Sequence, residues 1–363
     1  MIKRADIVIL GNHPNDGFSM HRHESLLEQG YKALGYSVKV VNPSDSISKR
    51  ITSRSIRKFI AYVECFVLFP VVVVASARPR LFFHVNDHSN AFWLRFPGIQ
   101  PALVTCHDLI AVKAARKELP EHQPGFFGKI YQSLVVFGLR KAREIYCVSG
   151  ATARDVNRIV PGVATRVIYN PIDSAVVSST AKCIAREGGY LIVVSSSGWR
   201  KDRATALRVW ERLREVAGID IGLKIVGPPL TVEERFGFDA KSLMMVETHS
   251  NLDDQQMSKM YAGALALLQM SRYEGFGWPI IEANMNHRVA VCSDLDVFRE
   301  IGPDNIFVSD LENSVDWASI WNLVNDPSRQ QMVFDFAQNY SFESYLKNLK
   351  NSISQLSTLV DSD

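Results

Sequence analysis

A loop rich in glycine reads Ser271-Arg-Tyr-Glu-Gly-Phe-Gly-Trp-Pro-Ile-Ile-Glu-Ala283 and directly follows the apolar run Ala264–Met270. Gly275 and Gly277 permit backbone conformations that other residues avoid, and they let the chain approach a ligand closely. Pro279 suits the first position of a helix, where its missing N–H costs nothing. The segment therefore predicts a strand, a glycine loop and a helix N-terminus, whose unpaired N–H groups favour a phosphate or another anion.

Two carboxylates belong to this segment, with Glu274 in the loop and Glu282 about one turn inside the helix. They can point toward one ligand from different depths and bind hydroxyl groups at two places. The alternative is structural, with Glu274 capping a turn and Glu282 complementing the helix dipole. We favour the functional interpretation because the glycines and Pro279 are interleaved with both glutamates.

Short apolar, β-branched runs recur on both sides of this segment, between longer amphipathic stretches. In the first half they are Ile7–Leu10, Val38–Val41, Leu81–Val85, Ala102–Cys106, Glu144–Ser149 and Arg166–Tyr169. In the second half they are Tyr190–Ser195, Leu223–Gly227, Leu243–Val246, Ala264–Met270, Val289–Ser293 and Ile306–Ser309. This alternation predicts an α/β protein of two Rossmann-like, doubly wound domains that face an interdomain cleft.

The length and composition of the chain fit two globular domains. Its 363 residues exceed the size at which a single hydrophobic core stops growing, and 47% hydrophobic with 22% charged residues is an ordinary soluble composition. We expect a first domain over residues 1–173, a small polar linker over 174–189 and a second domain over 190–335. A polar, helical segment over 336–363 closes the chain.

Several classes of function are disfavoured by the same sequence. The 41 basic and 38 acidic residues give a net charge of +3, and the resulting electrostatic field is too weak to indicate nucleic-acid binding. Five scattered cysteines without C-x-x-C spacing disfavour a disulfide framework and a zinc site, and fit a reducing cytoplasm. His13, His21 and His23 lack supporting ligands at metal spacing, so no metal site is predicted. No G-x-G-x-x-G follows the first strand, which disfavours a nicotinamide-dependent dehydrogenase.

The apolar run over residues 59–77, FIAYVECFVLFPVVVVASA, approaches the length that spans a bilayer. It carries Glu64 and is broken by Pro70, so we do not expect a transmembrane helix. Five basic residues precede it, namely Lys49, Arg50, Arg54, Arg57 and Lys58. Two interpretations stay open. The run can lie on an anionic membrane surface, or it can be a helix and a strand buried inside the first domain, which we favour.

The segment from residue 271 to 283 resembles the signature of family four of the retaining glycosyltransferases, S-x-x-E-G-F-G-x-P-x-x-E-A. The resemblance covers nearly the whole chain, most closely over residues 190–310. It implies a GT-B fold, a nucleoside diphosphate sugar as co-substrate and no cofactor. Downstream the chain departs from the family, because His287 and Val289 occupy the positions of glycine and proline.

The same resemblance implies roles for the residues of the segment. Glu274 would contact the hydroxyl groups of the donor sugar, and Glu282 the ribose of the nucleotide. The backbone of Gly275, Phe276 and Gly277 would contact the sugar and the phosphate. Members of the family lack an agreed protein nucleophile, so Glu274 is assigned to positioning and electrostatics.

A second loop, Ser195-Ser-Ser-Gly-Trp-Arg-Lys-Asp-Arg203, follows the first strand of the second half. Lys201 lies after a glycine turn at the opening of a helix, where it can neutralise a diphosphate leaving group. A solvated charged turn is the alternative interpretation. The family often has arginine five residues before this lysine, where this chain has Ser196, and Arg200 is a candidate to replace it.

Two loops of the first half also resemble the family. His107 follows the run Ala102–Cys106 in an H-D-L motif, where it can bind a sugar hydroxyl or share protons near the reacting centre. A structural histidine is the alternative. Gly17, in the loop after the first strand, resembles the glycine that lies over the donor diphosphate. Tyr340-Ser-Phe-Glu343 resembles the start of a closing helix that crosses back to the first domain.

Together with the resemblance, which implies retention at the anomeric carbon, the sequence predicts a metal-independent hexosyltransferase with Glu274, His107 and Lys201 at its catalytic centre. Protein cations and dipoles would replace a metal. Its partners would be a nucleotide-sugar donor and a glycan or glycolipid acceptor, in cytoplasmic synthesis of cell-surface polysaccharide, with peripheral contact to the inner membrane surface left open. The alternatives are a nucleotide-sugar epimerase of the same architecture and an inactive nucleotide-sugar-binding protein.

Overall fold

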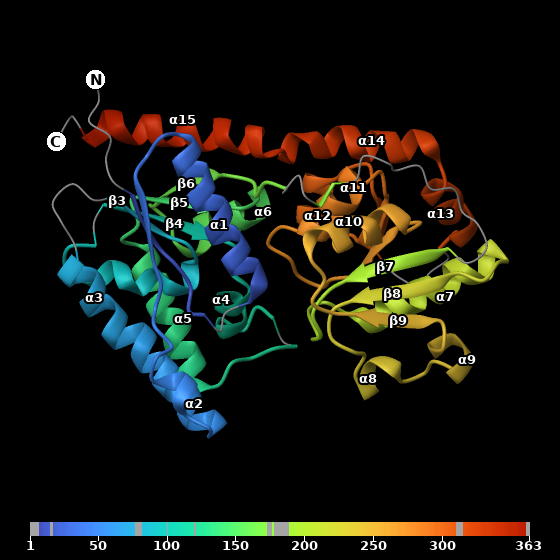
Figure 1. Ribbon diagram of the computed structural model, residues 1–363, viewed down its shortest axis with the longest axis horizontal. Helices are drawn as coiled ribbons and strands as arrows, with labels where there is room; N and C mark the ends of the chain where they lie inside the picture. Colours follow the sequence, from blue (N-terminus) through green and yellow to red (C-terminus); the bar gives the residue numbers. More distant parts are fainter. Residues whose placement is uncertain are drawn as a thin grey trace. The chain divides into compact units, whose positions relative to one another are not determined.

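The computed structural model describes residues 7–14, 17–76, 82–99, 101–119, 121–172, 176–177, 189–309 and 315–360. The chain forms two compact units (Figure 1). The first contains Met1–Asn170 and Tyr345–Asp363, and the second contains Pro171–Ser344. Most of the expected linker, residues 174–189, lies outside the described residues.

The first unit is built on a six-stranded parallel sheet in the order β2-β1-β3-β4-β5-β6. Its strands are β1 (Ile7–Leu10), β2 (Val38–Val41), β3 (Phe82–Val85), β4 (Ala102–Cys106), β5 (Glu144–Cys147) and β6 (Ala164–Val167). Strands β1, β4 and β5 are buried along their whole length. A sheet covered on both faces favours continuous apolar strands, which is why β1 and β4 could be predicted from the sequence, whereas β5 also buries Glu144.

Helices surround this sheet. They are α1 (Phe18–Ala33), α2 (Arg54–Val63), a π-helix (Glu64–Leu68), α3 (Phe69–Ser76), α4 (Ile110–Ala115), α5 (Phe126–Leu139) and α6 (Gly150–Ile159), with 3-10 helices at Ser48–Arg50 and His88–Arg95. From Tyr345 onward α15 (Phe342–Val360) belongs to this unit. A Cβ on Gly30 of α1 would lie 2.8 Å from the ring of Tyr345 and 3.0 Å from Leu349, so α15 packs closely on α1.

The second unit has its own six-stranded parallel sheet in the order β12-β11-β10-β7-β8-β9. The strands are β7 (Tyr190–Val194), β8 (Gly222–Val226), β9 (Val246–His249), β10 (Leu267–Gln269), β11 (Ala290–Ser293) and β12 (Ile306–Val308). The chain order reverses between β7 and β10. Ligands of doubly wound sheets bind at the carboxyl ends of the strands at such a switch point.

The helices of this unit are α7 (Arg203–Ala217), α8 (Val232–Arg235), α9 (Ala240–Leu243), α10 (Asp254–Gly263), α11 (Trp278–Met285), α12 (Asp296–Ile301), α13 (Trp317–Val324) and α14 (Pro327–Ala337). A 3-10 helix at Gln338–Tyr340 separates α14 from α15, so the closing helix begins at Phe342 rather than at residue 336. The indole N–H of Trp210, a fully buried residue of α7, donates to the carbonyl of Ile221 at 2.9 Å.

The predicted α/β architecture with two doubly wound units is confirmed, and each predicted run overlaps an observed strand. The largest error concerns β9, which begins at Val246, whereas Leu243 ends α9. β6 is also displaced and begins at Ala164. Both are edge strands with partly exposed residues, so their apolar signal is weaker than that of central strands.

The expectation that residues 59–77 form a buried helix and strand is wrong for the described part of this run. Residues 59–76 are helical throughout, and Phe59, Val71 and Val72 are more than half exposed. Among the described residues, no helix has both the length and the apolar character needed to cross a bilayer. Glu64 is turned inward and accepts hydrogen bonds from the backbone N–H groups of Ile47 and Ser48 at 2.7 and 3.3 Å.

Candidate active site

The loops that follow β7 and β10 meet at the switch point of the second sheet. The two loops are joined by a backbone hydrogen bond, in which the N–H of Arg272 donates to the carbonyl of Arg200 at 2.8 Å. A side-chain ion pair joins them again, with Arg272 Nε 2.9 Å from Asp202 Oδ2. Residues about 70 positions apart are thus held together because β7 and β10 are neighbouring strands.

Glu274 lies at the centre of this loop pair. Its Oε1 atom is 2.5 Å from Lys201 Nζ and accepts a hydrogen bond from Ser271 Oγ at 2.8 Å. Its Oε2 atom is 3.5 Å from Arg200 Nη1. The side chain of Glu274 is 8% exposed and that of Lys201 is 16% exposed. Two predicted site residues, Lys201 and Arg200, therefore contact the carboxylate of a third, Glu274, which is largely shielded from water.

The loop after β7 is not the solvated charged turn considered above. Lys201 lies two residues before α7, and Asp202 caps the helix by accepting from the N–H of Thr205 at 3.3 Å. Arg203 is 1% exposed and pairs with Glu234 Oε2 at 2.6 Å. Because Arg203 is engaged within the fold, Arg200 and Lys201 are the cations that this loop presents toward Glu274.

The glycine loop after β10 leads into α11 as the sequence predicts, although the helix begins at Trp278, one residue before Pro279. Gly277 has φ 120°, a conformation that strains any residue with a side chain. A Cβ there would also lie 2.9 Å from Ile301 and 3.0 Å from the ring of Phe298. The loop therefore requires glycine for both conformational and steric reasons.

Glu282 lies inside α11 and is 5% exposed. Its Oε2 atom accepts a hydrogen bond from the hydroxyl of Tyr261, a fully buried residue of α10, at 2.7 Å. Tyr261 therefore orients the carboxylate.

The departure from the family at His287 has a structural explanation. His287 has φ 56°, in the left-handed region that glycine adopts most readily. Its ring stacks on Phe334 of α14 with centroids 3.9 Å apart. The neighbouring Arg288 is buried and donates to the carbonyl of Ala262 at 2.6 Å, at the end of α10. The turn uses a backbone conformation that glycine adopts readily, and the stacked ring offsets part of the strain that histidine has there.

A pocket of about 370 Å³ adjoins the loop pair. Its lining includes Gly198, Trp199, Asp202, Glu233 and Arg272. Trp199 contacts the ring of Tyr273 edge to face, with centroids 5.7 Å apart. Aromatic, acidic and basic side chains thus surround a hollow at the carboxyl ends of the sheet.

In the first unit, His107 directly follows β4 and is 9% exposed. Its Nε2 lies 2.9 Å from the backbone carbonyl of Asn86, which can only accept, so Nε2 donates. Its ring contacts His23 edge to face, with centroids 4.5 Å apart. Burial lowers the pKa of His107 and outweighs the opposing effect of Asp87. The imidazole is therefore neutral, with Nδ1 as its acceptor atom.

Sequence reasoning missed the residues Asn86, Asp87 and His88, which follow β3. Asn86 donates to Asn12 Oδ1 at 2.8 Å, and Asn12 donates to Asp87 Oδ2 at 3.1 Å. His88 Nδ1 is 3.0 Å from Asp87 Oδ1. Burial lowers the pKa of His88, but the Asp87 carboxylate outweighs it and the net shift is upward. A run of polar residues at the end of the predicted strand 81–85 was the available signal.

Gly17 precedes α1 and has an ordinary φ of −63°. A Cβ there would meet no atom within 4 Å, so the fold itself does not require glycine at this position. In the part of the chain that the structure describes, His, Cys, Asp and Glu side chains do not gather into a group of three that could hold a metal.

Comparisons with known proteins agree with this architecture. The model of Glycosyltransferase Family 4 matches residues 21–176, and that of Glycosyl transferases group 1 matches residues 182–332. The serotype-specific mannosyltransferase WbdA of Escherichia coli is 29% identical over 246 residues, which cover 57% of this chain and 29% of WbdA. The chain therefore spans less than a third of the length of these relatives.

Solved structures share the fold at low sequence identity. Sucrose-phosphate synthase from Thermosynechococcus elongatus has a TM-score of 0.75 at 15% identity, over 98% of this chain and 100% of that one. Anabaena Alr3699/HepE, solved in complex with UDP and glucose, has a TM-score of 0.66 at 13% identity, over 97% and 100%. With two matching domain models and this fold, the chain belongs to the group 1 glycosyltransferases of GT-B architecture.

Proposed function

We propose that this protein transfers a hexose from a nucleoside diphosphate sugar to a hydroxyl group of a glycan or glycolipid, with retention at the anomeric carbon. The observation that carries the proposal is the contact of Lys201 and Arg200 with Glu274 at the switch point of the second sheet. Cations beside a glycine loop and the start of α11 offer a site for a diphosphate.

The reaction breaks the bond between the anomeric carbon and the phosphate oxygen and forms a bond from that carbon to the acceptor oxygen. Negative charge grows on the diphosphate, where Lys201, Arg200 and the N-terminus of α11 stabilise it. In attack from the same face, the acceptor's proton passes to the leaving phosphate oxygen. Glu274 holds the sugar hydroxyls and stabilises positive charge on the ring. These cations and dipoles take the place of a divalent metal.

His107 and Glu282 complete the proposed donor contacts. The neutral His107 donates through Nε2 to the Asn86 carbonyl, so Nδ1 can accept a hydrogen bond from a sugar hydroxyl. Glu282, oriented by Tyr261, accepts from the ribose hydroxyls. Gly17 and the backbone of Gly275 to Gly277 contact the phosphates and the sugar.

The relatives suggest where this reaction belongs. WbdA is a serotype-specific mannosyltransferase, so mannose is the first donor sugar to test and cell-surface polysaccharide the first class of product. A cytoplasmic enzyme that supplies such polymers acts on acceptors at the inner membrane surface. We therefore include peripheral membrane contact in the proposed function.

A thermal-shift screen against UDP-, GDP-, ADP- and dTDP-sugars tests the donor site, because a bound ligand raises the apparent stability. The donor that binds is then incubated with candidate acceptors in the presence of a chelator, and NMR of the product reports its anomeric configuration. Isomerised donor without acceptor supports the epimerase. Binding with no transfer to any acceptor supports the inactive protein, and loss of transfer with chelator contradicts metal independence.

A further inference from the structure

Helices α2 and α3 and the π-helix between them carry an apolar face that points to solvent. The exposed side chains include Phe59 at 65%, Val71 at 62%, Val67 at 56% and Ile56 at 55%. Residues buried in the same segment, such as Phe69 and Val73, belong to the core of the first unit. The segment is therefore apolar on both its inner and its outer face.

Helix α5 has the same property. Phe126, Ile130, Leu134 and Phe137 follow each other at spacings of four, four and three residues, which places them on one face of the helix. All four are exposed, Phe126 at 73%, and the neighbouring Phe127 is 84% exposed. An amphipathic surface helix normally turns such a stripe toward the core, so this stripe is oriented the opposite way.

These two faces belong to adjacent helices. The ring of Phe66, in the π-helix, lies 5.4 Å from the ring of Tyr131 in α5, and Figure 1 shows α2 and α3 beside α5. Of 19 large apolar side chains exposed among the described residues, seven lie on residues 54–76 and five on α5. We call the exposed face of these helices the apolar surface. Contiguous exposed apolar patches of this kind mark interaction sites.

The apolar surface is bordered by positive charge. Residues 54–76 and α5 contain one acidic residue, Glu64, and it is 2% exposed and bound to the backbone of the preceding 3-10 helix. Arg50 and Arg57 are exposed at the α2 end. Lys49 is exposed there too and pairs with Asp45 at 3.4 Å.

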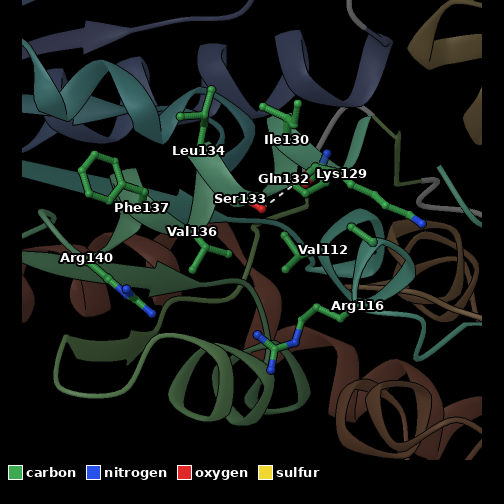
Figure 2. A pocket seen from close by; sticks show the side chains of 11 residues that line it. Val112, Arg116, Lys129, Ile130, Gln132, Ser133, Leu134, Val136, Phe137 and Arg140 are labelled. Atoms are coloured by element: carbon green, nitrogen blue, oxygen red, sulfur yellow. Dashed lines mark hydrogen bonds between the residues drawn. The ribbon is translucent and has the colours of Figure 1, made fainter. Parts of the chain in front are cut away.

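A pocket of about 680 Å³ between α4 and α5 adds three more cations (Figure 2). Arg116, Lys129 and Arg140 line it together with apolar residues such as Val112 and Phe137, and no carboxylate is among its lining residues. Arg116 also pairs with Glu118 at 3.1 Å. A pocket with an apolar wall and cationic groups suits a lipid that has an anionic headgroup and an apolar acyl chain.

We propose that the apolar surface lies in the interface of an anionic phospholipid bilayer, with its aromatic and aliphatic side chains among the upper acyl chains and the flanking cations on lipid phosphates. Amphipathic helices with basic flanks bind membranes in this way. A second copy of the chain is a poorer occupant, because a two-fold contact would bring like charges together. This inference rests on the proposed function, because it identifies the surface through which the proposed membrane contact is made. Lipid binding can be measured without donor or acceptor.

Co-sedimentation of the full-length protein with vesicles tests the inference. We expect binding to mixed phosphatidylcholine and phosphatidylglycerol vesicles, weak binding to phosphatidylcholine alone, and loss of most binding at about 0.5 M salt. The double variants Phe126→Ser/Phe127→Ser and Val71→Ser/Val72→Ser should each bind the anionic vesicles at least about tenfold more weakly. Phe236→Ser is the matched control, because Phe236 is 85% exposed on the second unit and should bind within about twofold of wild type.

Three results would overturn the inference. They are wild-type protein that stays in the supernatant with anionic vesicles, double variants that bind like wild type, and a wild-type dimer in gel filtration that the same substitutions dissociate. Thermal shift with nucleotide sugars on the same variants separates this from the proposed function. If the protein binds vesicles but no nucleotide sugar raises its Tm, the membrane-binding inference stands and the donor site is refuted. If a nucleotide sugar raises the Tm but vesicles are not bound, only the membrane-binding inference is refuted.

Discussion

Replacing Lys201 with alanine removes a cation that directly contacts the Glu274 carboxylate. Lys201 Nζ lies 2.5 Å from Glu274 Oε1, and the two side chains are 16% and 8% exposed. Without Lys201, the carboxylate keeps the Ser271 hydroxyl at 2.8 Å and the Arg200 guanidinium at 3.5 Å. An incoming diphosphate would then meet a poorly compensated negative charge where a cation had been.

The contacts set the size of the effect. Removing one partner of a fully buried ion pair costs about 3–5 kcal/mol. Because Lys201 retains some exposure and Arg200 remains, we expect about 1–2 kcal/mol of lost folding stability and a Tm lower by about 2–8 °C. The effect on catalysis is larger, since the lost charge faces the leaving group, and kcat/KM should fall about 10²–10³-fold.

The double variant Lys201→Ala/Glu274→Gln tests whether the uncompensated charge of Glu274 causes the loss of nucleotide binding in Lys201→Ala. Neutralising Glu274 removes the repulsion that the single variant leaves behind, so the double variant should bind the nucleoside diphosphate about three- to tenfold more tightly than Lys201→Ala. Isothermal titration calorimetry on the wild type, both single variants and the double variant gives the coupling. If Lys201→Ala binds nucleotide as tightly as wild type, or if the double variant binds no more tightly than Lys201→Ala, the electrostatic reasoning is refuted.

Three further predictions concern neighbouring residues. Glu282→Ala should raise KM for the donor about tenfold or more, whereas Glu274→Ala should mainly lower kcat; unchanged steady-state kinetics in both variants would contradict the assigned roles. Because burial holds the pKa of His107 below its ordinary value, its neutral form persists from about pH 8 to about pH 6.5, and kcat/KM should lose the His107 contribution only in more acidic solution. The variant His107→Gln should lack that acid limb in its pH profile, and a wild-type profile that already falls near neutrality because of this residue would oppose the proposal. His287→Ala should unfold about 1–2 kcal/mol more easily in urea, because it keeps φ 56° and loses the stack on Phe334, while His287→Gly should lose less; equal losses would show that backbone strain is unimportant there.

Local patterns were sufficient to predict much of this protein. β1 and β4 are continuous apolar runs inside the sheet, and both were located to the residue, as was the edge strand β2. The glycine loop and the start of α11 were predicted because Gly277 and Pro279 constrain the backbone within a few residues. These features depend on the steric and hydrogen-bonding properties of neighbouring residues, which a sequence states directly.

The pairings of distant residues were decided by the tertiary structure. Lys201 and Glu274 meet only because β7 and β10 are adjacent strands, and the order of strands depends on long-range packing. The same holds for Asn86 and Asp87, which gain their partner Asn12 from a neighbouring strand end.

Whether an apolar helix face is buried or exposed could not be predicted from the sequence either. Residues 59–77 and α5 are both rich in apolar residues. We expected residues 59–77 to be buried for this reason, yet many apolar side chains of both segments are exposed. Periodicity shows that apolar residues share a face, but it does not say whether the fold supplies enough surface to cover that face. The sequence by itself determined most of the segments that become strands, loops and helices, since those choices are largely local. Only the folded chain decided which charges meet and which apolar faces remain in contact with solvent, because both depend on what the rest of the chain places against them.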